Sequence, residues 1–280
     1  MEIGENKDIF LYAKNINLHN TENYHLSIDI SSSNFSYCLL DINKLKFVYF
    51  KSFKTNNNNN IINKINTEEI LKRNFYSASC SYSNLPCTLI PISLHSKNNN
   101  VNLFKFITDQ GNKIKYEKID KIDANILYSI DENISKIITQ IQPNIKEFNS
   151  SNIFISQFLS IIEGKNNDDS NIMFGIISKE NVEIIIINKT KLVFHNIFSI
   201  NSNTDILYYI LYCYEQLDMD PEVNFLYLYG ETNTQKKSFQ LLYKYIRHVR
   251  IGEIEKKLSF CNELNQIPKH QYFALFSQLL

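Results

Sequence analysis

The residues best suited to chemistry form the run Asp29-Ile30-Ser31-Ser32-Ser33, which ends an apolar segment with the pattern of a strand. An acid at the end of a strand can hold hydrated magnesium, and the N–H groups of the following turn can contact phosphate oxygens. A turn that approaches phosphate closely favours glycine, which has no Cβ, and this run contains none. The run therefore has the acid and the hydroxyls of a phosphate-binding turn but not the glycine.

Other residue types with catalytic potential do not converge by spacing. Asp29 and Asp41 lie on adjacent strand-like segments, an arrangement that can hold metal ions for phosphodiester cleavage, but both also fit the ends of strands. Ser238 and Cys213 have no base within sequence reach. Three histidines are isolated and lack the spacing of a zinc site: His25, His195 and His248. We therefore assign no catalytic, cofactor-binding or metal-binding residue.

A basic segment near the end of the chain contains two tyrosines, Tyr243 and Tyr245. Cations interleaved with aromatic rings can contact the phosphates and bases of RNA. Glu253 and Glu255 dilute the positive charge, which favours an ordinary solvated surface. RNA association stays open as an alternative, carried by Lys236, Lys237, Lys244, Arg247, Arg250, Lys256 and Lys257.

The whole chain is electrically balanced, because its 280 residues carry 29 basic and 29 acidic side chains. A formal net charge of zero gives no reason to expect DNA or an anionic membrane as a partner. No apolar run reaches the roughly 18–20 residues that span a bilayer, and the polar start excludes an ordinary signal peptide. Five scattered cysteines indicate reduced thiols, so we expect a cytoplasmic protein.

The elements that must position these residues are laid down twice. Residues 24–30, 35–41 and 45–53 read as three consecutive strands followed by a helix. The same plan returns in residues 171–178, 182–188 and 191–198, followed by a helix that Ser202-Asn203-Thr204-Asp205 opens. Further strands are inserted in the first half. The pattern predicts two α/β halves with mixed sheets.

The remaining segments predict how the chain divides. We expect an N-terminal arm at residues 1–20, a first subdomain at 21–165 and a second at 166–280, because the polar run 165–170 follows a helix stop. Other expectations concern single elements. They are an exposed loop at 55–60, a helix at 67–74, a hairpin at 110–112, a strand at 152–155 with a helix at 157–163, and a closing helix at 269–280 that docks on the second half.

Several short stretches match a known family in their order along the chain. They include Tyr24-His25-Leu26-Ser27-Ile28-Asp29, Leu226-Tyr227-Leu228-Tyr229-Gly230-Glu231 and His270-Gln271-Tyr272-Phe273. The chain resembles the actin-like ATPase fold of sugar kinases, 70-kilodalton chaperones and bacterial pilus and division ATPases. More specifically, it resembles an uncharacterised bacterial family, mainly from Bacteroidetes, with a degenerate form of this fold. The resemblance implies a two-lobed actin-like ATPase (ribonuclease H-like) fold of duplicated βββαβαβα units, and it implies no activity.

The resemblance also implies where nucleotide would bind, and three loops there depart from the active pattern. Active relatives carry Asp-x-Gly after the first strand, where this chain has Ser31 in place of glycine. The corresponding turn of the second half, residues 177–181, has no glycine at all, and Glu180 would repel phosphate. The paired glycines on the adenosine side are reduced to Gly230-Glu231. The three departures together argue against ATP binding.

We therefore expect a non-catalytic actin-like scaffold or adaptor that binds another protein and uses no cofactor. One alternative is an ATP-binding or ATP-hydrolysing protein that uses Asp29 and residues 31–33. The other alternative is an RNA-associated protein.

Overall fold

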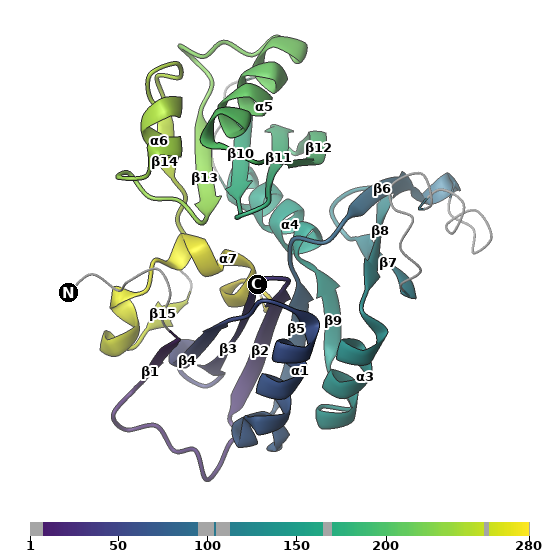
Figure 1. Cartoon of the computed structure of the whole chain (residues 1–280), viewed down its shortest axis with the longest axis vertical. Coiled ribbons are helices and arrows are strands. Elements are labelled where there is room, and N and C mark those ends of the chain that lie inside the picture. Colours follow the sequence, from purple (N-terminus) through teal and green to yellow (C-terminus); the bar gives the residue numbers. More distant parts are fainter. Residues whose placement is uncertain (1–7, 95–103, 105–112, 165–169, 255–257, 280) are drawn as a thin grey trace.

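The chain folds into two lobes at opposite ends of its long axis, with helices packed on the sheets of both (Figure 1). The computed structural model describes residues 8–94, 104, 113–164, 170–254 and 258–279. Each lobe contains a mixed sheet, and a small third sheet lies beside the first lobe.

The first-lobe sheet starts as an antiparallel meander and continues with parallel strands. β2, β3 and β4 pair antiparallel in sequence, and β5 then pairs parallel with β2 and with β9. The strands β1 and β15 cover the outer edge of β4. The bounds are β1 (Ile9–Tyr12), β2 (Tyr24–Ser31), β3 (Asn34–Asp41), β4 (Lys46–Lys54), β5 (Ser77–Tyr82), β9 (Lys146–Asn149) and β15 (Ser259–Phe260).

Two helices cover one face of this sheet, α1 (Asn58–Thr67) and α3 (Glu132–Ile141). Their buried isoleucines, such as Ile61 and Ile134, belong to the same apolar cluster as Leu26 of β2. Strand residues alternate between the two faces, so the odd-numbered positions of β2 face away from this cluster. That opposite face carries the polar residues of the candidate site.

The second-lobe sheet repeats the same pairing. β10, β11 and β12 form an antiparallel meander, and β13 and then β14 continue it in parallel. α5 (Asn203–Gln216) and α6 (Lys237–Leu242) share the apolar cluster on one face. The strands are β10 (Asn171–Ile177), β11 (Asn181–Asn188), β12 (Lys191–Ser199), β13 (Leu226–Gly230) and β14 (Val249–Ile251).

The predicted duplication is confirmed by strand order. Inside the edge strand β1, the first sheet reads β4-β3-β2-β5-β9, and the second reads β12-β11-β10-β13-β14. Each meander therefore places its own first strand, β2 or β10, in the middle of five strands. The predicted helix start at Ser202 is also confirmed, because Ser202 and Asp205 form a reciprocal capping box. The division of the chain at residues 20 and 165 stays a prediction.

The inserted strands form the small sheet, in the order β6-β8-β7. They are β6 (Cys87–Pro91), β7 (Lys113–Ile119) and β8 (Ala124–Ile130). The inward side of this sheet, with Ile119 and Ile126, shares a cluster with β11 and with α4 (Ser150–Glu163). The insertion therefore touches both lobes.

The helix α4 corrects one prediction. Residues 152–155 were expected as a strand and 157–163 as a separate helix, but a single helix runs through both, capped by the side chain of Asn149. Its buried side chains surround most of its circumference, and Phe154 and Phe158 contact aromatic rings of the second lobe and the C-terminal segment. A helix buried on nearly all sides loses the polar stripe that distinguishes it from a buried strand.

Glu117, which hydrogen bonds to the residue that caps α4, makes the stability of the protein depend on pH. Glu117 Oε1 accepts the backbone N–H of Asn149 at 2.7 Å. Burial raises the pKa of Glu117 to about 7, against the opposing effects of this hydrogen bond, of Asn152 and of Lys115. The raised pKa means that the folded protein holds a proton that the unfolded chain releases at lower pH. The free energy of unfolding therefore falls as pH rises from about 4.5 to about 7.

We expect Glu117→Gln to remove this pH-dependent loss of stability. The change in the free energy of unfolding that it causes should be about 1–2 kcal/mol more favourable at pH 8 than at pH 4. The glutamine oxygen can still accept the N–H of Asn149. Urea unfolding of wild type and variant across pH 4–8 measures the difference. Glu163→Gln, at the exposed other end of α4, is the control and should leave the pH profile unchanged. A pH profile that Glu117→Gln does not flatten would contradict this assignment.

The asparagine run corrects a second prediction. Residues 55–60 were expected as an exposed loop and 67–74 as a helix, but α1 starts inside the run and ends at Thr67. The side chain of Asn57 accepts the N–H of Asn60 at 2.9 Å, so asparagine acts as the N-cap. Ile61 and Ile65, four residues apart, bury the same face. Residues 69–72 form only a 3₁₀ turn.

The C-terminal segment corrects a third prediction. It was expected as one helix that docks on the second lobe. Phe273 does contact Tyr229 of that lobe, but α7 (Phe273–Phe276) is short and also packs on the first-lobe sheet and on α4. Phe276 contacts Phe47 and Phe50 of β4, at ring centroid distances of 4.9 and 5.8 Å. Apolar helical spacing identifies a buried face but does not say which lobe buries it.

Some predictions lie outside the described residues. They are the hairpin at 110–112, most of the polar boundary at 165–170, the first residues of the N-terminal arm, and Glu255, Lys256 and Lys257 of the basic segment.

Candidate functional site

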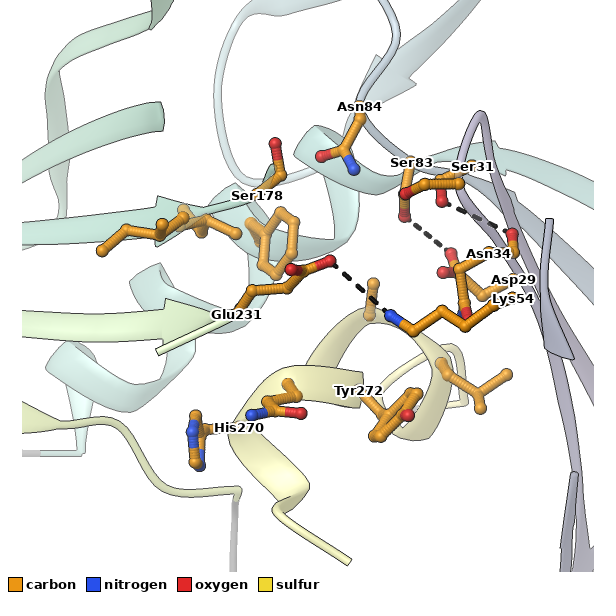
Figure 2. Close-up of a pocket in the computed structure, with 18 residues that line it drawn as sticks. Asp29, Ser31, Asn34, Lys54, Ser83, Asn84, Ser178, Glu231, His270 and Tyr272 are labelled. Carbon is orange, nitrogen blue, oxygen red and sulfur yellow. Dashed lines mark hydrogen bonds and ion pairs between the residues drawn. The ribbon is translucent and has the colours of Figure 1, made fainter. Parts of the chain in front are cut away.

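The candidate site is a small cavity of about 90 Å³ between the two lobes. First-lobe strands supply Asp29 and Lys54, the second lobe supplies Ser178 and Glu231, and the C-terminal segment supplies Tyr272. Figure 2 shows these side chains converging from three directions. The site therefore lies where the resemblance places nucleotide.

Asp29 lies on β2, on the face opposite α1. Its Oδ1 accepts the hydroxyl of Ser81 at 2.5 Å and the hydroxyl of Ser83 at 2.7 Å. Burial raises the pKa of Asp29, and these two hydrogen bonds oppose that shift. The carboxyl is thus already engaged by hydroxyls of its own lobe, and the charged form is disfavoured.

A hydrogen-bonded layer behind Asp29 joins the sheet to the end of the chain. The Gln278 amide donates to Ser81 Oγ at 2.8 Å and to the carbonyl of Ile28 at 2.7 Å. Ser79 donates to Gln278 Oε1 at 2.5 Å and also bonds to His25 Nε2 at 2.8 Å. Burial, and then the charge of Lys146, lower the pKa of His25 to about 4. His25 is therefore a neutral, buried part of this layer.

The turn after β2 borders the cavity. Ser31 and Ser33 line the cavity, and Ser31 Oγ donates to the carbonyl of Asn34 at 3.4 Å. Ser31 and Asn34 are paired residues of a tight hairpin. Positive φ occurs elsewhere in the described chain but at none of residues 31–34. Serine at the glycine position is therefore unstrained here.

In the corresponding turn of the second lobe, the polar groups hydrogen bond to one another. Ser178 Oγ donates to the side-chain oxygen of Asn181 at 2.8 Å and accepts the N–H of Asn181 at 3.1 Å. Ser178 lines the cavity. Glu180, which the sequence placed against phosphate, is exposed and lies outside the cavity lining.

Gly230 and Glu231 come from the end of β13. Gly230 has φ +77°, and a Cβ there would lie 2.2 Å from the carbonyl oxygen of Ile177. The Glu231 N–H donates to the same oxygen at 2.7 Å. This close approach directs the Glu231 side chain into the cavity, where it forms a 3.9 Å ion pair with Lys54 of the first lobe (Figure 2). The ion pair bridges the lobes across the cavity.

The C-terminal segment forms the floor of the cavity. His270 Nε2 hydrogen bonds to the carbonyl of Thr232 at 2.7 Å, and burial lowers the pKa of His270. Tyr272 donates to Ser52 of β4 at 3.4 Å. Phe273 contacts Tyr229 of the second lobe at a centroid distance of 4.8 Å. Consecutive residues of one segment therefore hold both lobes.

Sequence reasoning found Asp29, Ser31 and Glu231 in this site and missed Lys54 and the C-terminal segment. Lys54 could have been found from the meander pattern. It ends the third strand, opposite Asn34 at the start of the second strand, and therefore lies next to the turn at residues 31–34. No local signal predicted that the C-terminal segment lines the cavity, because this depends on the chain returning to a position between the lobes.

The other candidates lie apart from the cavity. Asp41 is at the far end of the β2–β3 ladder from Asp29, and its Oδ1 accepts the N–H groups of Asn43 and Lys44. The structure therefore does not bring the two aspartates together. Ser238 is buried in α6, and burial raises the pKa of the Cys213 thiol to about 11, which disfavours the nucleophilic thiolate.

The isolated histidines have structural partners. His195 Nε2 bonds to the buried Glu183 carboxylate at 2.9 Å, and His248 stacks on Phe225. Among the residues that the structure describes, no three His, Cys, Asp or Glu side chains gather as metal ligands do. Likewise, no helix in the described ranges is both long and apolar enough to cross a membrane.

The basic segment carries two cations with partners of their own. Arg247 forms an exposed 3.4 Å ion pair with Glu222, and Arg250 lies 4.7 Å from the ring of Phe225. Tyr243 and Tyr245 are exposed.

The size of the cavity limits what it can hold. A typical small-molecule site has a volume of roughly 300–1,000 Å³. The cavity of about 90 Å³ between the lobes is far smaller. It has room for a few water molecules or a small polar group.

Comparisons with known proteins agree with the architecture. A family model described as "Protein of unknown function (DUF3822)" matches residues 13–249. A crystal structure from Bacteroides thetaiotaomicron, of a protein with actin-like ATPase fold and unknown function, aligns with a TM-score of 0.75 at 22% identity over 85% of this chain and 93% of that one.

The type IV pilus biogenesis complex PilM-PilN aligns with a TM-score of 0.59 at 8% identity, over 92% of this chain and 98% of the other. No curated protein matches. The predicted actin-like ATPase fold is confirmed by these likenesses.

Proposed function

The chain belongs to the DUF3822 family of proteins of unknown function, and from its cleft we propose that it is a non-catalytic actin-like scaffold that binds another protein. Its nucleotide site, in this proposal, is closed by the chain's own residues. The observation that carries the proposal is the Lys54–Glu231 ion pair, which crosses the cavity above the C-terminal segment (Figure 2).

The charges in the cavity support this reading. Triphosphate binding requires cations and free N–H groups around the phosphates. Among the lining residues, Lys54 is the cation from the first-lobe strands, and it already faces the Glu231 carboxylate. Asp29 is half-buried and bonded to two serine hydroxyls. An incoming phosphate would have to displace the Glu231 carboxylate from Lys54 and would lie near it, which opposes binding.

A protein-binding role fits a preserved scaffold, because folds commonly keep their architecture while their sites change. The PilM structure is that of a complex with PilN. We extend that kind of role, assembly with another protein, to this chain as part of the proposal. The division into an arm and two subdomains at residues 20 and 165, and a cytoplasmic location with all five cysteines unpaired, belong to the same proposal.

Nucleotide binding is the test. We expect the melting temperature of the full chain to stay within about 1 °C when Mg-ATP is added to about 5 mM, because a ligand that does not bind cannot stabilise the folded state. Asp29→Ala is the matched variant. A rise of several degrees in wild type that Asp29→Ala abolishes would contradict the proposal and support the ATP-binding alternative.

ATP binding stays the competing function because Asp29, Ser31 and Ser33 do line the cavity. RNA association has a different signature, namely binding that weakens steeply with salt and is lost when Lys237 and Lys244 are reversed in charge.

A further inference from the structure

The strand β12 (Lys191–Ser199) forms an open edge of the second-lobe sheet. It pairs with β11 on one side, and no strand of the described ranges pairs with its other side. An open edge offers backbone N–H and C=O groups to another strand. Natural edge strands are usually short or are interrupted by proline or charge. β12 spans nine residues and, after Lys191, contains no proline and no Lys, Arg, Asp or Glu.

The first lobe shows how the equivalent edge is closed. β4 has the same place in its sheet as β12, and each shows one register shift against the preceding strand. The outer edge of β4 is covered by β1, which pairs antiparallel with residues 49–52. The duplicated architecture therefore accepts an antiparallel strand at this edge in one lobe, and in the other the described chain supplies none.

Aromatic rings extend from the open edge onto the adjacent helix. Phe194 and Phe198 of β12 stack at a centroid distance of 6.4 Å, and Phe198 stacks on Tyr209 of α5 at 4.5 Å. Tyr209 contacts Tyr208 at 5.3 Å, and Tyr208 is 61% exposed. On the strand itself, Val193 is 43% exposed. The open edge thus adjoins an apolar surface that gains by being covered.

Opposite charges near the two ends of β12 favour a second copy of the chain as the partner of this edge. Lys191 is exposed at the start of the strand. Glu180 is exposed beside its end, because the Glu180 carbonyl accepts the N–H of Ile200 at 2.9 Å. In an antiparallel pair of identical strands, the start of each strand lies beside the end of the other. Lys191 of each copy would then lie near Glu180 of the other copy, and the contact would occur twice.

We propose that β12 pairs antiparallel with β12 of a second copy of this chain, about a two-fold axis near His195, so that the two second-lobe sheets become one. Such a two-fold contact is self-complementary and closes without further addition of copies. Both α5 helices then lie on the same face of the joined sheet. This inference does not depend on the fate of the nucleotide site.

The test is the oligomeric state of the full chain, measured by analytical ultracentrifugation at about 5–100 µM. We expect wild type to sediment at twice the mass of one chain at the upper concentrations. Ile197→Pro should give a monomer with unchanged circular dichroism. The Ile197 N–H donates to the side chain of its neighbour Asn196 at 2.9 Å. The bond from the Ile200 N–H to the Glu180 carbonyl sets a register in which Ile197 and Glu183 are a non-hydrogen-bonded pair, so proline there removes no bond to β11.

Charge reversal provides the second arm and does not disturb the backbone. Lys191→Glu alone and Glu180→Lys alone should each raise the dimer dissociation constant by about 3- to 10-fold. The double variant should restore it to within about 3-fold of wild type, because the two pairs are re-formed with opposite sign. A wild-type chain that stays monomeric at about 100 µM, a dimer that survives Ile197→Pro, or a double variant weaker than both single variants would each overturn the proposal.

Discussion

Phe273→Ala will lower the free energy of unfolding by about 3–5 kcal/mol, the largest effect that we expect from a single substitution. Phe273 is 2% exposed and lies among three rings, with centroid distances of 4.8 Å to Tyr229, 5.3 Å to Phe158 and 5.8 Å to Phe154. Removing its ring leaves a cavity between the C-terminal segment, α4 and the second lobe. The surrounding helix and strand are fixed at both ends and can fill it only in part.

Urea unfolding monitored by circular dichroism measures this loss. Phe10→Ala is the control, because Phe10 is the same residue type at a position that is 50% exposed. We expect Phe10→Ala to cost less than about 1 kcal/mol. Similar losses for both variants would mean that the C-terminal segment does not hold the lobes together.

Gly230→Ala will destabilise the protein by about 2–5 kcal/mol. The left-handed φ of +77° is unfavourable for any residue with a Cβ, and that atom would lie 2.2 Å from the carbonyl oxygen of Ile177. The strand end must therefore move, which displaces Glu231 from the cavity and weakens its ion pair with Lys54.

Gly164→Ala is the matched control at the end of α4. A Cβ at Gly164 would meet no atom closer than 3.8 Å, and the backbone there is helical. We expect a change of less than about 1 kcal/mol. If Gly230→Ala were as mild as Gly164→Ala, the close approach at the end of β13 would not be what positions Glu231.

These two positions lie at contacts that connect the two lobes. In an ATP-driven clamp, the lobes rotate as ligand enters and leaves. Here Tyr272 bonds to the first lobe and its neighbour Phe273 packs on the second lobe. Glu231 of the second lobe adds an ion pair with Lys54 of the first. Separating the lobes here would expose the rings around Phe273, which opposes opening of the cleft at this point.

The sequence predicted the meanders well because their signals are local. Short polar turns such as residues 31–34 separate alternating apolar segments, and each strand pairs with its neighbour in the chain. Capping is equally local, so the start of α5 at Ser202 was confirmed. The same reasoning gave a wrong prediction for the asparagine run at residues 55–60. Its composition indicated a loop, but the side chain of Asn57 caps a helix that starts there.

Contacts between distant segments could not be predicted in this way. The resemblance to actin-like ATPases implied that Asp29 and Glu231 lie at the nucleotide loops, because each is at the end of an apolar strand. The pairing of Glu231 with Lys54 joins residues far apart in the chain, and it depends on how the lobes are set against each other. The return of residues 269–278 to the first lobe depends on the same arrangement, which no periodicity encodes.

We propose that the chain's own side chains occupy the place of nucleotide. Isothermal titration calorimetry of the full chain with Mg-ATP tests it most directly. The account predicts no saturable heat up to about 1 mM ligand, for wild type and for Asp29→Ala alike. A micromolar dissociation constant that Asp29→Ala abolishes would contradict it.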